Sequence, residues 1–193
     1  MGLSSNVRHH LKRAITFLSD SSTSLTRYVL LVFPLALLPS LVLVALSSQI
    51  ANLANGAHTV AAPSAQPTSP GPNFLFLIVV APLFETIVLR WLISLARKAL
   101  NKAVPIALVC GLVFGLVHAM SIGPLAFLSA TWGFFVFATA YLAWERRSRM
   151  HAFVAAAAPH ALANGVVFLM MHLGTGPGQA ADWHAAGYPL QWL

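Results

Sequence analysis

The sequence has very little charge for its length. Only 8% of its 193 residues are Asp, Glu, Lys or Arg, and just four of these are acidic. A soluble domain usually has about 25% charged residues, so the composition excludes an ordinary soluble protein. The single cysteine, Cys110, excludes a disulfide framework. The hydrophobic share of 58% and the mean hydropathy of +0.77 instead indicate a membrane protein.

Long apolar runs predict an all-α fold, a polytopic transmembrane helix bundle of about five spans at residues 28–172. Roughly 20 apolar residues are needed to cross the hydrocarbon core of a bilayer. Such runs cover residues 28–50, 74–96, 104–120, 125–144 and 152–172. Residues 1–27 are predicted to form a cytoplasmic segment with a short interfacial helix, and 173–193 a C-terminal tail. Residues 51–73 contain no Lys, Arg, Asp or Glu, and are predicted to be an extramembrane loop.

The basic residues are unevenly distributed between the apolar runs. Four of the eleven precede the first run, three lie between the second and third, and three between the fourth and fifth. The positive-inside rule therefore places the N-terminus and both of these loops in the cytoplasm. Short clusters separated by spans suit anionic lipid, not a continuous phosphate groove, so no nucleic-acid partner is expected. The compact chain and its basic topology favour the bacterial inner (cytoplasmic) membrane.

An acidic side chain, Glu85, falls near the middle of the second run. A charge there costs on the order of several kcal/mol, which makes an intramembrane ionisable residue a functional candidate. A purely structural ion pair with Arg90 is the alternative, but five residues correspond to about 140° around a helix. Glu85 therefore needs a partner from another helix or from water. Arg90 shares a face with Thr86. It is interpreted as a supporting residue, which either snorkels to the interface or donates hydrogen bonds to carbonyls of a neighbouring helix.

Two further pairs of side chains lie on the third and fifth runs. Phe114 and His118 are four residues apart, as are His160 and Asn164, so each pair shares a helix face. Taken singly, each has a structural reading, as an interfacial residue or as interhelical hydrogen bonding. Counted from the cytoplasmic span ends, His160 lies about 12 Å deep, Glu85 about 16 Å and His118 about 21 Å. Span ends that are uncertain by a few residues and a helix tilt of about 20° cover this spread, so the three side chains can converge on one site near mid-membrane.

A carboxylate, two imidazoles and a carboxamide together suit the activation of water. The carboxylate of Glu85 is a candidate general base, and neutral donors can stabilise an oxyanion. The same carboxylate, with His118 and His160, could instead bind a divalent metal such as zinc. The segment does not match the His-Glu-x-x-His pattern of soluble zinc proteases, so the residues leave both possibilities open.

Three segments in order resemble the motifs of the CPBP family, the type II CAAX prenyl proteases and bacteriocin-processing intramembrane proteases. The family pattern is Glu-Glu-xxx-Arg, Phe-xxx-His and His-xxx-Asn or Asp on successive membrane helices. The matching segments are Glu85-Thr86-Ile-Val-Leu-Arg90, Phe114-Gly-Leu-Val-His118 and His160-Ala-Leu-Ala-Asn164. The resemblance covers about residues 74–170. Thr86 replaces the second glutamate of the family, which removes a partner of Arg90 but not the candidate base.

The resemblance implies an intramembrane endopeptidase whose substrate is a membrane-embedded or membrane-anchored protein or peptide. Glu85 would activate water with His118, while His160 and Asn164 would polarise the scissile carbonyl and stabilise the oxyanion. Thr86, Arg90 and Phe114 would support them. The family is often labelled as metalloproteases, although a glutamate mechanism is also argued; we favour the latter and keep zinc open. The alternatives are a non-catalytic scaffold or bacteriocin self-immunity protein with the same fold, and a small transporter.

Overall fold

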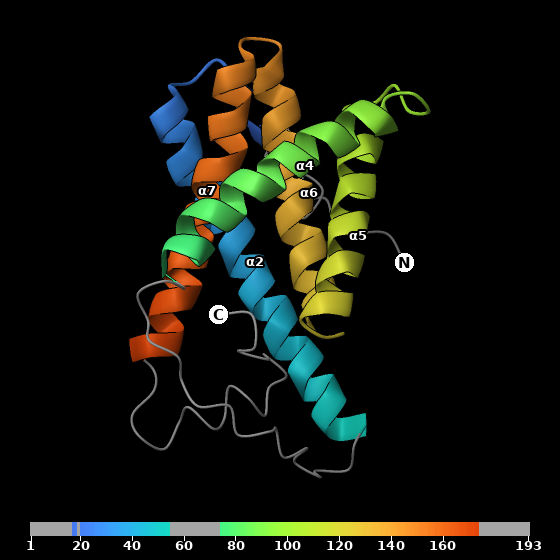
Figure 1. Ribbon diagram of the computed structural model, residues 1–193, viewed down its shortest axis with the longest axis vertical. Helices are drawn as coiled ribbons and strands as arrows, with labels where there is room; N and C mark the ends of the chain where they lie inside the picture. The colour runs from blue at the N-terminus through green and yellow to red at the C-terminus, as the bar shows by residue number, and fades with distance from the viewer. Residues whose placement is uncertain (1–16, 19, 55–73, 174–193) are drawn as a thin grey trace, which may run out of the picture.

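The computed structural model describes residues 17–18, 20–54 and 74–173 of the chain, and the regular elements of this part are all helices (Figure 1). In chain order they are α2 (Leu25–Ala54), the π-helix η1 (Phe76–Val80), α4 (Ala81–Ala96), α5 (Ala103–Ser121), α6 (Ala126–Glu145) and α7 (Arg149–Leu173). The all-α fold predicted from the sequence is thereby confirmed.

Five of these helical segments are long and apolar enough to cross a membrane, which confirms the predicted span count. The segments are Leu25–Ala51, Phe76–Ala96, Ala103–Ser121, Ala126–Glu145 and Arg149–Met170. The second combines η1 with α4, so one span contains a change of helix type. Burial is lowest in the first segment, at 17% of its most apolar window, and highest in α6, at 56%. Within the described part of the chain, the first span is therefore the least covered by other helices, and α6 is the centre of the bundle.

Three predictions fall wholly or largely outside the described residues. These are the interfacial helix within residues 1–27, the extramembrane loop at 51–73 and the C-terminal tail at 173–193. The cytoplasmic location of the N-terminus also stays a prediction, because a helix bundle alone does not show which end faces which compartment.

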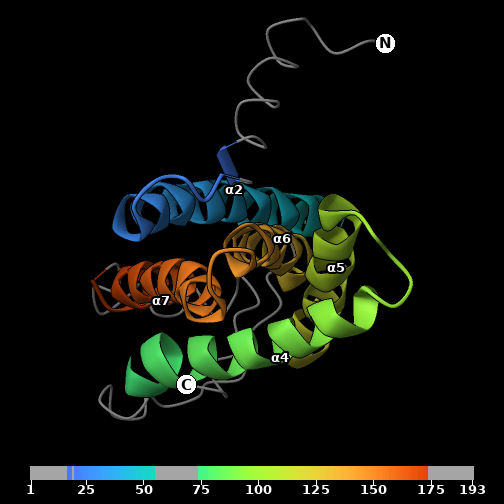
Figure 2. The ribbon, with the colours of Figure 1, turned by 90° about the horizontal axis from the view of Figure 1, so that it is seen from above.

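The helices lie in layers on either side of the pair formed by α6 and α7. Seen from above, α2 packs on one side of this pair, α4 lies on the other, and α5 closes the end next to α6 (Figure 2). In the side view, α4 crosses in front of α6 and α7 at an angle (Figure 1). Side chains on the inner face of α4 are thus brought towards those of α5 and α7.

The close packing of α5 on α6 depends on two glycines one turn apart. A Cβ atom on Gly111 would lie 2.5 Å from the backbone oxygen of Thr131, and one on Gly115 would lie 2.0 Å from its Oγ1. Glycines at this spacing let two membrane helices approach closely without side chains between them. Since His118 follows Gly115 by three residues, this contact also fixes the distance of its imidazole from α6.

Aromatic and polar contacts join α2 to the C-terminal end of α6. The ring of Tyr28 packs edge-on against Trp144, with centroids 5.3 Å apart, and its hydroxyl donates to the carbonyl of Leu18 at 2.6 Å. At the same end, Arg97 forms an ion pair with Glu145, which connects the end of α4 to the end of α6. The C-terminal end of α6 is therefore held by contacts with α2 and with the end of α4.

Candidate active site

Three ionisable side chains from three different spans meet inside the bundle. Glu85 comes from α4, His118 from α5 and His160 from α7. The Nε2 atom of His160 lies 3.3 Å from Oε2 of Glu85, and Nε2 of His118 lies 3.9 Å from Oε1. Each oxygen of the carboxylate therefore faces one imidazole. The structure brings together the three residues for which similar membrane depths were estimated.

The imidazoles are held by aromatic rings that the sequence did not single out. His160 stacks on Phe137 with ring centroids 4.7 Å apart, and meets the edge of Phe134 at 5.2 Å. His118 lies 5.3 Å from the same Phe134 ring. Phe114, predicted as a supporting residue, stacks on Phe134 at 3.8 Å and nearly parallel. The Phe134 ring thus lies between the two histidines, and Phe114 holds it in place.

The tautomer of His118 follows from its hydrogen bond within α5. Its Nδ1 lies 2.9 Å from the backbone oxygen of Phe114, four residues earlier. A carbonyl oxygen can only accept a hydrogen bond, so Nδ1 carries the hydrogen. In the neutral imidazole, Nε2 then presents a lone pair towards Glu85. The four-residue spacing of the Phe-xxx-His segment therefore has a direct consequence for the chemistry that His118 can perform.

Asn164 lies one turn beyond His160 on α7, but its carboxamide contacts the backbone of another span. Its Nδ2 donates a hydrogen bond to the carbonyl oxygen of Leu77, in η1, at 2.9 Å. One of the two amide hydrogens is therefore used in a contact between helices. The oxyanion role expected for Asn164 stays a prediction.

The two remaining supporting residues occupy different surroundings. Thr86 is buried, with 2% of its surface exposed, and its hydroxyl donates to the carbonyl of Pro82 at 2.7 Å. This is the bond to the preceding turn that threonine commonly forms within helices. Arg90 is exposed. Thr86 and Arg90 thus share a helix face, but one side chain is buried and the other is exposed.

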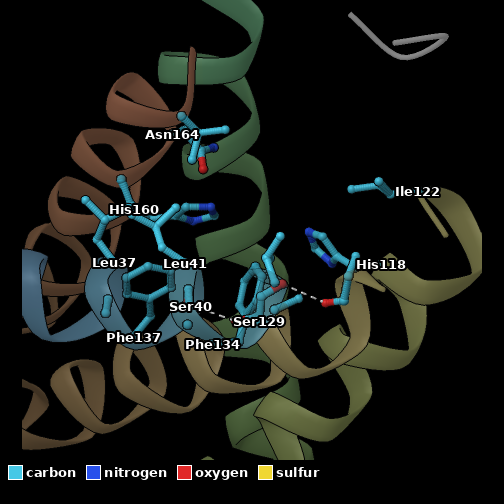
Figure 3. A pocket seen from close by; sticks show the side chains of 17 residues that line it. Leu37, Ser40, Leu41, His118, Ile122, Ser129, Phe134, Phe137, His160 and Asn164 are labelled. Carbon is cyan, nitrogen blue, oxygen red and sulfur yellow. Dashed lines mark hydrogen bonds between the residues drawn. The ribbon is translucent and has the colours of Figure 1, made fainter. Parts of the chain in front are cut away.

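A cavity of about 180 Å³ adjoins the two histidines (Figure 3). Its walls come from α2, α5, α6 and α7, and most of the lining side chains are apolar. His118 and His160 reach its surface from α5 and α7, as does Asn164 (Figure 3). The apolar cavity therefore lies next to the two histidines that face the Glu85 carboxylate.

Glu85, His118 and His160 are the side chains that would hold a zinc ion at this site. Among the residues that the structure describes, no three His, Cys, Asp or Glu side chains are arranged as a metal-binding set. The zinc set of Glu85, His118 and His160 that the sequence left open is thus not preformed in this geometry. Zinc binding stays a prediction.

A family model described as "type II CAAX prenyl endopeptidase Rce1-like" matches residues 67–166, about half of the chain. The chain belongs to this Rce1-like family. The resemblance to the CPBP intramembrane proteases, inferred from three short segments, is thereby confirmed. No curated protein and no solved structure shows significant similarity to the chain.

The range matched by the family model includes the whole candidate site. The matched range contains Glu85, His118, His160 and Asn164. The family and the five apolar helices together establish a multi-pass membrane protein related to CAAX-type proteases. The bacterial inner membrane stays a prediction.

Proposed function

We propose that the protein is an intramembrane endopeptidase that hydrolyses a peptide bond in a membrane-embedded or membrane-anchored protein or peptide. The main support is the carboxylate of Glu85, which lies between the imidazoles of His118 and His160 from two other spans. Ionisable groups inside spans are rare, and usually take part in function. Because the chain belongs to a protease family, peptide hydrolysis is the reaction that these groups are best suited to catalyse.

In the proposed first step, a water molecule bound by Glu85 and His118 attacks the scissile carbonyl carbon. The 3.9 Å between Nε2 of His118 and Oε1 of Glu85 is too long for a direct hydrogen bond. Both atoms are therefore available to accept hydrogen bonds from one water molecule. Glu85 takes a proton from this water as its oxygen bonds to the carbonyl carbon.

The same proton transfer changes what His160 can do. A neutral His160 with its hydrogen on Nε2 donates to the anionic carboxylate of Glu85, 3.3 Å away. Once Glu85 is protonated, that carboxyl group no longer needs the donor. The N–H of His160 then stabilises the negative charge that develops on the carbonyl oxygen, in surroundings with little water. Collapse of the tetrahedral intermediate breaks the C–N bond, and Glu85 returns its proton to the leaving amine.

The apolar cavity beside the histidines fits a substrate segment that lies within the membrane. Apolar walls with a few convergent polar groups are typical of binding sites for small ligands and peptide side chains. Here the polar lining residues include His118, His160 and Asn164. We propose that an apolar side chain next to the scissile bond occupies this space during cleavage.

The test is cleavage of membrane-anchored peptides by the purified protein in proteoliposomes, with products identified by mass spectrometry. His160→Ala should lower the cleavage rate about 10²- to 10³-fold, the usual range for loss of an oxyanion donor. His118→Ala should lower it about 100-fold, because the attacking water loses one of its two hydrogen-bond partners and is misplaced. His151→Ala is the matched control, because His151 is an exposed histidine at the start of α7.

Product formation at the same rate in the two site variants and in the control would overturn the proposal. If the wild-type protein and its variants cleave none of the peptides and remain equally folded, the non-catalytic scaffold is favoured instead.

A further inference from the structure

The second span changes helix type immediately before the turn that carries Glu85. Within η1, the N–H of Ala81 bonds to the oxygen of Phe76, five residues earlier. The next bond of this ladder would run from residue 82 to the oxygen of Leu77. Residue 82 is a proline and has no N–H to donate. The π-helix therefore ends at this point, and the oxygen of Leu77 lacks the next backbone donor.

A backbone carbonyl within a membrane span needs a partner, because water is scarce in the hydrocarbon region. Asn164 provides one, since its Nδ2 donates to the oxygen of Leu77 at 2.9 Å from the neighbouring helix α7. The side-chain amide thus replaces the donor that Pro82 removes.

Two further contacts join the same stretch of α7 to the start of the second span. A Cβ atom on Gly165 would lie 3.7 Å from Cδ1 of Ile78, so this glycine faces the π-helix at close range. One turn later, Phe168 packs edge-on against Phe74, with ring centroids 5.2 Å apart. The hydrogen bond of Asn164 is therefore part of a continuous seam between the two helices.

The seam and the contact between Glu85 and His160 both join α7 to the second span. His160 precedes Asn164 by one turn of α7 (Figure 3), and Glu85 follows Pro82 by three residues on α4. Any change in how the junction at Pro82 sits against α7 would therefore alter the distance between Glu85 and His160.

We propose that Asn164 is a positioning residue that ties the π-to-α junction at Pro82 to α7, and thereby holds Glu85 at its distance from His160. This inference rests on the proposed function, because positioning is defined here by its effect on peptide cleavage. It gives the residue a task distinct from donating to the oxyanion of the substrate. The proline and the asparagine act as a pair, in which one removes a donor and the other replaces it.

The experiment is a double-mutant cycle in proteoliposomes with Asn164→Ala, Pro82→Ala and the combination of both. Alanine at 82 has an N–H, which can bond to the oxygen of Leu77 and continue the π-helical ladder. In the wild-type background, Asn164→Ala should lower kcat about 100-fold with little change in KM, as expected for a displacement near 1 Å at the reacting groups. In the Pro82→Ala background, the same change should lower kcat less than about tenfold, because the two positions are coupled.

Equal losses in kcat in the two backgrounds would overturn the proposal, and would assign Asn164 a direct contact with the reacting substrate. Wild-type activity in Asn164→Ala would overturn it as well. Asn164→Leu, which retains side-chain volume, is measured in parallel, with thermal unfolding in detergent as the readout of folding. If both Asn164 variants fail to fold, restoration of folding by Pro82→Ala supports the proposal, and failure to restore it overturns the proposal.

Measuring Glu85→Gln beside the cycle separates this inference from the proposed function. If Glu85→Gln is inactive while the effect of Asn164→Ala is independent of Pro82, only the positioning role fails. If Glu85→Gln cleaves normally, the proposed catalytic function itself fails.

Discussion

A single methyl group added at Gly111 should separate α5 from α6. The new Cβ would lie 2.5 Å from the backbone oxygen of Thr131, and 3.2 Å from both N and Cβ of Phe135. Carbon and oxygen atoms in helix contacts are normally about 3.3 Å apart or more, so the helices must move by about 0.8 Å. The nearest atoms belong to a backbone, which cannot rotate away as a side chain can. We therefore expect Gly111→Ala to lower the free energy of unfolding by about 1–3 kcal/mol, as over-packing usually does.

The same displacement should reach the active site. His118 lies two turns after Gly111 on α5, and its position relative to Glu85 would change with the helix. A shift near 1 Å at a catalytic group can lower the rate about 100-fold. Unfolding in detergent and peptide cleavage in proteoliposomes measure the two effects separately.

Gly165→Ala is the control for the effect on stability, because among the described residues its Cβ would meet only Cδ1 of Ile78, at an ordinary contact distance of 3.7 Å. Alanine is favoured over glycine within helices by about 1 kcal/mol, so this variant should unfold no more easily than the wild type. The reasoning is refuted if Gly111→Ala proves as stable as Gly165→Ala.

Three further results are expected. Chelators should leave cleavage unchanged under the glutamate mechanism, whereas a loss of activity that zinc restores would contradict it. Gly133→Leu should fill the cavity and raise KM for membrane-anchored peptides, since even a Cβ there would already lie 3.7 Å from Phe137; unchanged kinetics in a folded variant would argue against the cavity as a substrate site. Arg97→Ala should lower the unfolding free energy by less than about 1 kcal/mol, because its ion pair with Glu145 is partly exposed; a larger loss on thermal unfolding would count against this.

The spans and the meeting of the three ionisable residues were predictable for a common reason. A membrane requires long apolar segments, so hydropathy alone identified five spans whose bounds differ from the observed helices by a few residues. Because few polar residues are tolerated inside such segments, Glu85, His118 and His160 stood out against their surroundings. Their estimated depths then agreed within the allowance for a few residues at each span end and for helix tilt.

The details that depend on contacts between helices were not predicted. The π-helix before Pro82 and the bond from Asn164 to Leu77 depend on how α7 packs against the second span, which no single segment records. The exposed position of Arg90, in contrast, agrees with its interpretation as a snorkelling residue.

The sequence contains one further signal, for the packing of α5 on α6. Gly111 and Gly115 form the four-residue glycine spacing typical of close helix pairs in membranes, and the structure shows the two residues against α6. In contrast, the placement of Phe134 and Phe137 around the histidines had no such signal, because α6 is apolar on nearly every side.

The most direct test of the account is the rate of peptide cleavage by Glu85→Gln in proteoliposomes under single-turnover conditions. Glutamine retains the size and polarity of the side chain next to His118 and His160, but it cannot take a proton from water. Loss of an acid–base group lowers rates about 10²- to 10⁴-fold, and we expect the upper part of this range, with folding unchanged. Cleavage by Glu85→Gln within about tenfold of the wild-type rate would contradict the role of this carboxylate as the base.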